Sequence, residues 1–229
     1  MDGATAISLV LSGDPTLFAI VRLSLLVTVS ATLIAAAIGL PAGALIALAR
    51  FPGRSAVIVG LNALMGLPPV VVGLLVYLAL SRSGPLGALG LLFTPQAMII
   101  AQSLLITPIV AALTRQVIDD LWIEYRDELT ALGVSRIGRV KALLWDARFS
   151  LVTILLAGFG RAAAEVGAVM IVGGNIDGFT RVMTTTIALE TSKGNLSLAI
   201  GLGLVLITMV VMVNMLAWAV RQWSERHAG

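Results

Sequence analysis

The chain has 229 residues, of which 59% are hydrophobic and 12% are charged, and its formal net charge is +3. A mean hydropathy of +1.03 leaves too little polar surface to cover a water-soluble globule. The chain has no cysteine, which excludes disulfides and thiolate chemistry, and its one histidine, His227, makes a metal site unexpected. The composition therefore indicates a membrane protein.

Five apolar stretches are long enough to cross a hydrocarbon layer of roughly 30 Å, which takes about 20 helical residues. They occupy residues 17–48, 56–80, 95–114, 151–172 and 196–220. We expect helices, because the backbone amides of a segment in lipid must be satisfied within that segment. No basic segment precedes the first stretch, so a removable signal peptide is not expected. The sequence predicts an all-α, polytopic membrane protein, with residues 1–229 forming a single transmembrane domain.

The basic residues are unevenly divided between the two sets of loops. Ten follow the first, third and fifth spans, whereas four lie in the other set. Because short cytoplasmic loops carry an excess of Lys and Arg, the N-terminus is expected outside and the C-terminus in the cytoplasm. Membrane topology then explains the sequence pI of about 10.0, and nucleic-acid binding is not expected.

The first two spans contain features that interrupt regular helices. Residues 17–48 would extend roughly 48 Å, so this helix is expected to tilt, to project into the cytoplasm, or to break at Gly39-Leu40-Pro41. Its Ser24 and Thr28 hydroxyls either satisfy backbone carbonyls or line a pore. Pro68-Pro69 predicts a kinked or unwound second span, which is typical of packing kinks and of substrate routes alike.

The fourth span carries two charged residues within the expected membrane region. Arg161 and Glu165 are four residues apart, so both lie on one helix face within reach of each other. The pair is either a local ion pair or a positive group on the route of an anion. After it, Gly173-Gly174-Asn175 predicts a helix end, and residues 182–191 predict a short, threonine-rich helix at the outer surface or re-entering the membrane.

The longest polar segment, about 115–148, lies between the third and fourth spans. Leu121, Tyr125, Leu129 and Leu132 recur at helical spacing, and a second helical pattern runs over 137–144. Gly133 falls between the patterns, where glycine adopts a left-handed backbone at little steric cost. The segment predicts two short amphipathic helices, which either bind a soluble partner or lie on the membrane surface.

This segment resembles the cytoplasmic loop of the permease subunits of bacterial ABC importers, which runs Glu-Ala-Ala, three residues, Gly, and nine residues before a hydrophobic stretch. Asp127 occupies the Glu position, Gly133 the Gly position, and Leu143 begins the hydrophobic stretch. Glu128 and Leu129 replace the two alanines. The resemblance implies a type I ABC importer core with a coupling helix pair, in which Asp127, Glu128 and Gly133 transmit movement from the ATPase.

A closer resemblance to the tungstate-type permeases, relatives of the molybdate and sulfate permeases, covers nearly the whole chain. It rests on residues 50–54, 161–168, 173–176, 180–185 and 189–194. It implies a homodimer in the bacterial or archaeal cell membrane, with cytoplasmic ABC ATPase subunits and an extracytoplasmic oxyanion-binding protein. The substrate is expected to be tungstate, with molybdate, sulfate or another anion as the alternative.

The chain lacks the Gly-x-x-x-x-Gly-Lys-[Ser/Thr] pattern that holds ATP phosphates, because neither Lys141 nor Lys193 stands in it. The chain is therefore expected to be a transport subunit with no catalytic residues and no bound cofactor, and ATP is expected to be used by a partner.

Candidate residues along the route of a dianion are hydroxyl donors and charged groups, namely Ser24, Thr28, Arg161, Glu165, Thr184 and Thr185. The rival hypotheses are a self-contained secondary carrier that uses Glu165 as its coupling carboxylate, and a scaffold that only anchors a soluble complex.

Overall fold

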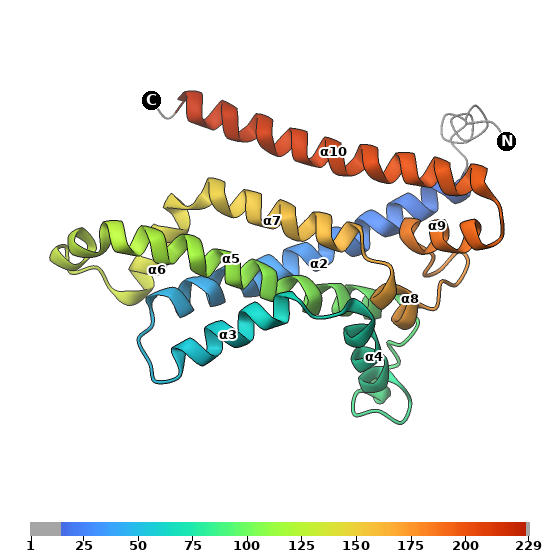
Figure 1. The fold of residues 1–229 in the computed structure, drawn as a ribbon, viewed down its shortest axis with the longest axis horizontal. Helices are drawn as coiled ribbons and strands as arrows, with labels where there is room; N and C mark the ends of the chain where they lie inside the picture. Colours follow the sequence, from blue (N-terminus) through green and yellow to red (C-terminus); the bar gives the residue numbers. More distant parts are fainter. Residues whose placement is uncertain (1–14, 228–229) are drawn as a thin grey trace.

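The structure, a computed structural model, describes residues 15–227, and every regular element in that range is a helix (Figure 1). The residues before Pro15, on which the expected absence of a signal peptide rests, lie outside this range. In chain order the elements are α2 (Pro15–Leu48), α3 (Arg54–Met65), α4 (Pro69–Leu80), η1 (Gly87–Leu89), α5 (Pro95–Ala131), α6 (Arg136–Asp146), α7 (Arg148–Ala163), α8 (Gly167–Gly173), α9 (Met183–Ser192) and α10 (Leu196–His227). The all-α polytopic fold expected from the sequence is confirmed.

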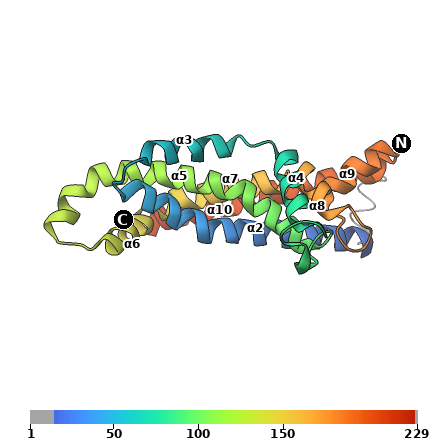
Figure 2. The same ribbon diagram turned by 90° about the horizontal axis from the view of Figure 1, so that it is seen from below.

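The long helices lie roughly along one axis, and the connecting segments gather at its two ends. The α2–α3 turn, the α5–α6 turn and the end of α10 lie at one end, whereas α9 and the start of α2 lie at the other (Figures 1 and 2). We call these the coupling end and the α9 end. The grouping agrees with the two sets of loops inferred from the basic residues.

Within residues 15–227, three helices, α2, α5 and α10, are each long and apolar enough to span a membrane, and the number rises to five if α3–α4 and α6–α7 each count as one broken span. Helix α5 is the central one, since 67% of its most apolar window is buried, compared with 17% for α10. Most of the α10 surface therefore faces away from the rest of the chain.

The first expected span is a single helix. Helix α2 continues through Pro41, so the break expected as one possibility at Gly39-Leu40-Pro41 is absent from it. The proline leaves the Ala37 carbonyl without its helical donor. Close packing keeps the two halves in line: Gly39 lies against Val110 and Gly43 against the Ala111 carbonyl of α5.

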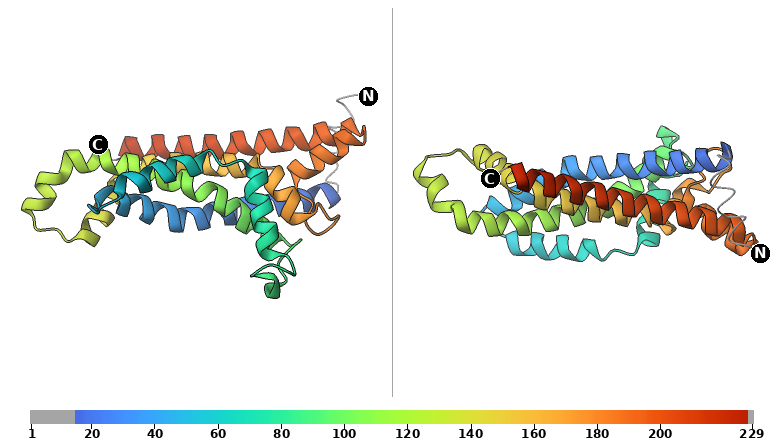
Figure 3. Two further views of the ribbon diagram at one scale, coloured as in Figure 1. Left: turned by 60° about the horizontal axis from the view of Figure 1, so that its bottom comes forward. Right: turned by 90° about the horizontal axis from the view of Figure 1, so that it is seen from above.

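The second expected span, 56–80, is not a straight crossing. Its two halves, α3 and α4, meet at 99°, with the bend at Leu67-Pro68, so the predicted interruption at the double proline is confirmed. Figure 3 shows α3 along the bundle and α4 projecting from it. At about 1.5 Å per residue, each 12-residue half is about 18 Å long, shorter than the hydrocarbon layer.

The third and fourth expected spans have different ends from those predicted. Helix α5 runs 37 residues to Ala131 without stopping at 114, because the pattern at Leu121, Tyr125 and Leu129 continues its buried face onto α2, α6 and α7. The first of the two expected short helices is therefore the end of α5, and only α6 is separate. The expected span 151–172 is divided into α7 and α8 by residues 164–166.

Candidate functional site

A small cavity, partly open at the surface of the chain, brings together three of the hydroxyl residues singled out in the sequence. It is lined by Ser24 and Thr28 of α2 and Thr184 of α9, together with residues of α5, α7 and α10. The three lining residues are each at most 9% exposed. The cavity volume is about 10 Å³, which holds about one water molecule, so an anion with four oxygens does not fit inside a single chain in this conformation.

Hydrogen bonds through these hydroxyls tie α9 to the bundle. The Ser24 hydroxyl donates to the Ile20 carbonyl (2.8 Å) and accepts from the Met183 backbone N–H (2.8 Å). The Thr184 hydroxyl donates to the Glu165 carbonyl at 2.8 Å, in the unwound segment between α7 and α8. Both hydroxyls therefore satisfy backbone groups and also border the cavity, so the two interpretations of Ser24 in the sequence are compatible.

Gln102 is a residue of this cavity that the sequence analysis missed. It lies on α5, is 4% exposed, and donates from Nε2 to the Ala162 carbonyl at 3.0 Å. Its Oε1 is buried without a hydrogen-bond partner among the described residues, and Gln102 is one of the residues that line the cavity. A glutamine within the apolar part of an expected span was the available signal, because a buried amide in a span requires polar partners.

Arg161 and Glu165 form the ion pair that their spacing allows. The Arg161 Nη1 to Glu165 Oε2 distance is 2.8 Å, and the side chains are 37% and 4% exposed respectively. Glu165 Oε1 also accepts the Ala168 backbone N–H at 3.0 Å, so the carboxylate satisfies the start of α8. Neither residue lines the cavity. Through Glu165, the pair links Arg161 of α7 to the backbone of α8 across the break between the two helices.

Helices α4 and α8, which come from the second and fourth expected spans, pack against each other beside this ion pair. A Cβ on Gly73 of α4 would lie 2.7 Å from Ala168 Cα, and one on Gly167 would lie 2.9 Å from a Val70 methyl. Small residues at both positions therefore allow α4 and α8 to touch backbone to backbone.

Arg161→Ala is expected to lower the free energy of unfolding by about 2 kcal/mol, because it leaves the Glu165 carboxylate buried without its charged partner. The double variant Arg161→Ala/Glu165→Gln should recover part of that loss, since a neutral amide is easier to bury. Thermal unfolding of the purified protein in detergent measures both. Unchanged stability with reduced transport would instead assign Arg161 to the anion route.

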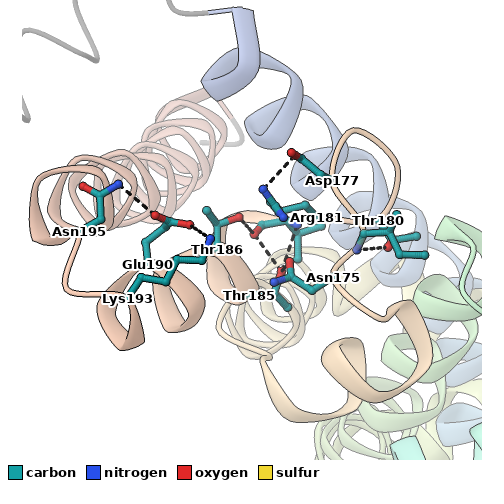
Figure 4. A network of polar contacts seen from close by, with 11 residues as sticks. Asn175, Asp177, Thr180, Arg181, Thr185, Thr186, Glu190, Lys193 and Asn195 are labelled. Carbon is teal, nitrogen blue, oxygen red and sulfur yellow. Dashed lines mark hydrogen bonds and ion pairs between the residues drawn. The ribbon is translucent and has the colours of Figure 1, made fainter.

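The α9 end is held by a network of polar contacts (Figure 4). The Thr185 hydroxyl donates to Asn175 Oδ1 at 2.8 Å and accepts the Val182 N–H at 3.2 Å, so it fixes the loop before α9 and does not line the cavity. Glu190 accepts hydrogen bonds from Lys193 (2.9 Å) and Asn195 (3.0 Å). These bonds, that of Lys193 first, lower the pKa of Glu190, which therefore stays ionised between α9 and α10.

The three coupling-loop residues lie at the opposite end, far from the cavity. Gly133 has φ +64°, the left-handed backbone expected for it, and joins α5 to α6. The Asp127 side chain is 91% exposed and pairs with the exposed Arg126 at 3.2 Å, and Glu128 is also exposed, so both carboxylates are accessible to a partner. The Asp146 carboxylate, followed by Glu124, raises the pKa of Tyr125 and keeps its hydroxyl protonated.

Arg54 fastens the end of α2 to α5 at the coupling end. It donates to the Ile46 and Ala47 carbonyls (2.9 and 3.1 Å), which are free at the end of a helix, and pairs with Asp119 at 2.8 Å. Asp119 also pairs with Arg115. Arg54, the first residue of α3, therefore links the end of α2 to α5.

Among residues 15–227, no three His, Cys, Asp or Glu side chains gather to hold a metal ion.

Residues 39–228 match the family described as binding-protein-dependent transport system inner membrane component.

Curated relatives extend the comparison over most of the chain. A probable anion ABC transporter permease protein of Haloferax volcanii is 42% identical over 205 residues, covering 87% of this chain and 88% of its own length. The tungstate uptake system permease protein TupB of Peptoclostridium acidaminophilum is 40% identical over 217 residues, covering 95% of each chain. The sulfate transport system permease protein CysW of a Synechocystis species is 26% identical, covering 82% of this chain and 71% of its own. The chain therefore belongs to the inner membrane components of binding-protein-dependent transport systems, and its fold class is the type I ABC importer core expected from the sequence.

Proposed function

We propose that this chain is the permease subunit of an ATP-driven importer of tungstate. The substrate rests on the 40% identity to a tungstate permease over 95% of both chains. Sulfate is one alternative, because a sulfate permease is a more distant relative at 26% identity. Molybdate is the other, because the tungstate-type permeases that the chain resembles are relatives of the molybdate permeases.

The observation that carries the transport mechanism is the continuity of α5. Gln102 borders the cavity and Asp127 lies near the exposed tip of the same uninterrupted helix. Gln102 and Asp127 are 25 positions apart, which corresponds to about 38 Å of helix. A push on the α5–α6 turn therefore acts on the same helix that borders the cavity, which continues through Pro108 between the two sites. Through Arg54 the push also reaches α2, the other wall of the cavity.

The partners follow from the two ends of the bundle. Cytoplasmic ABC ATPase subunits bind the α5–α6 turn, where Asp127 and Glu128 are exposed, and an extracytoplasmic oxyanion-binding protein meets the α9 end. The N-terminus is then outside and the C-terminus cytoplasmic, as the basic residues indicate. ATP is bound by the partner subunits, because this chain lacks the phosphate-binding pattern.

A homodimer provides the route. The cavity within one chain admits a water molecule but no oxyanion, which supports a passage between two copies that opens when the subunits rotate. Thr28 then offers a weak hydroxyl contact at the wall of that passage. Ser24 and Thr184 donate to the anion only after their hydroxyls leave the Ile20 and Glu165 carbonyls, so each contact is weak and the anion is released readily.

A proton-coupled secondary carrier is less well supported. Both Glu165 oxygens are already engaged, one by Arg161 and one by the Ala168 N–H. A carboxylate that must take up and release protons in each cycle would have to leave both partners.

Deletion of the gene is expected to lower cellular tungsten selectively when tungstate is supplied at nanomolar concentration, and the wild-type gene should restore it. Mass spectrometry of cellular tungsten and molybdenum measures both metals in the same samples. ATP depletion should abolish the restored uptake, whereas collapse of the pH gradient alone should not.

A loss of molybdenum with unchanged tungsten would move the substrate to the sister group. Uptake that followed the pH gradient and ignored ATP would contradict the proposed energy source.

A further inference from the structure

A groove of about 430 Å³ runs between α7 and α10, outside the cavity described above. Its lining is mainly apolar, with Phe149, Val152 and Leu156 from α7 and Ala217 and Trp218 from α10. The two helices are in contact with each other (Figure 3). The volume lies within the range of about 300–1,000 Å³ that is usual for small-molecule sites.

The polar side chains inside the groove are largely satisfied by their own helices. The Thr153 hydroxyl donates to the Phe149 carbonyl (3.4 Å), and Asn214 Nδ2 donates to the Val210 carbonyl (2.8 Å). The interior therefore presents few free donors and suits a hydrocarbon chain better than a polar ligand.

One end of the groove carries a fixed positive charge. The Arg148 guanidinium lies 4.5 Å from the Phe149 ring centroid and 5.1 Å from that of Trp145, and its Nη1 donates to the Trp145 carbonyl at 2.8 Å. Among the side chains that the structure describes, no carboxylate is within ion-pair distance of Arg148. The charge is held in place and has no counter-ion among the described side chains.

The position of Arg148 is that of a membrane interface. It is the first residue of α7, between the polar segment 115–148 and the apolar span. Trp145 and Trp218 beside it are 72% and 62% exposed, and tryptophan is enriched at the headgroup level of membranes. An apolar groove that ends, at this level, at a cation with no counter-ion in the described part of the chain is complementary to an anionic lipid.

We propose that the α7–α10 groove binds one anionic phospholipid from the leaflet that faces the 115–148 segment. An acyl chain lies between Val152 and Trp218, and Arg148 donates hydrogen bonds to the phosphate. The proposal is independent of the transported substrate, because its test contains no transport measurement.

The test is native mass spectrometry of the purified full-length chain in detergent, titrated with phosphatidylglycerol or phosphatidylcholine that carry identical acyl chains. One phosphatidylglycerol per chain is expected to bind at least about tenfold more tightly than phosphatidylcholine. Arg148→Gln should remove that preference, since a charge-assisted hydrogen bond contributes about tenfold in affinity or more. Arg148→Lys should retain part of it, which separates loss of charge from loss of folding.

Arg139→Gln is the matched control, because Arg139 also stacks on a tryptophan, Trp122, at 5.3 Å but does not line the groove. Equal binding of the two lipids, or an unchanged preference in Arg148→Gln, would overturn the proposal. So would efficient disulfide formation by Thr153→Cys: the chain has no native cysteine, so such a bond joins two copies and assigns the groove to a protein interface.

Discussion

Replacing Gly133 by Val is expected to lower tungstate uptake at least about tenfold while leaving the amount of protein in the membrane near normal. Gly133 has φ +64°, a backbone that costs an L-residue about 1–2 kcal/mol and a β-branched residue more. A penalty of this size lowers the population of the native turn roughly tenfold. A Cβ there would meet nothing within 4 Å, so the effect is on the backbone of the turn and not on packing.

Gly133→Asn should lose much less uptake, because asparagine tolerates the left-handed region. Gly90→Val is the matched control: Gly90 also has positive φ (+61°) and open space around its Cβ position, but it lies between η1 and α5, away from the coupling end. Uptake of tungstate by cells and ATP hydrolysis by the purified complex are the two measurements. If Gly133→Val and Gly90→Val had the same effect on both, the α5–α6 turn would have no special part in coupling.

The second large effect is expected at Gly43, where a valine should prevent α2 from packing against α5. A Cβ at this position would lie 2.4 Å from the Ala111 carbonyl oxygen and 2.8 Å from Thr114 Cβ. Since the first of these is backbone, relief requires moving one helix. Overpacking of this kind costs about 3 kcal/mol or more. Gly43→Val should therefore lower the midpoint of thermal unfolding in detergent and reduce the protein found in the membrane.

Gly60→Val and Gly203→Val are the controls, because both glycines are helical and a Cβ would have nothing within 4 Å. They carry the same change in helix propensity without the collision. A loss of stability in the controls equal to that of Gly43→Val would attribute the effect to propensity and not to the α2–α5 contact.

Local sequence was a good guide to elements whose cause is local. The double proline Pro68-Pro69 removes backbone donors wherever it stands, so the bend between α3 and α4 was predictable. The left-handed Gly133 and the helix end at Gly173-Gly174 were predictable for the same kind of reason. Pro41 was not, because its effect depends on the close contact of Gly39 and Gly43 with another helix.

Local sequence predicted only part of the candidate site. Ser24, Thr28 and Thr184 were selected as hydroxyls, and the fold brings them to one cavity although up to 160 residues separate them. Thr185, one residue further, has the same chemistry and points instead to Asn175. The role of Gln102 could not be predicted from its neighbours in the sequence, because the Ala162 carbonyl to which it donates belongs to another helix, 60 residues away. Which of several similar side chains meets which is therefore not contained in their type or spacing.

The sequence by itself determined that this is an all-helical membrane protein with polar ends, because hydrophobic length and the backbone's need for hydrogen bonds act residue by residue. It also determined where α5 gives way to α6, through a glycine free to adopt positive φ. Only the tertiary structure decided that α5 is one helix from the cavity to that turn, continuing through Pro108. It also decided that Glu165 serves both Arg161 and α8, and that an apolar groove ends at Arg148. Each of these depends on contacts between helices distant in the chain, and such contacts are fixed by packing in three dimensions.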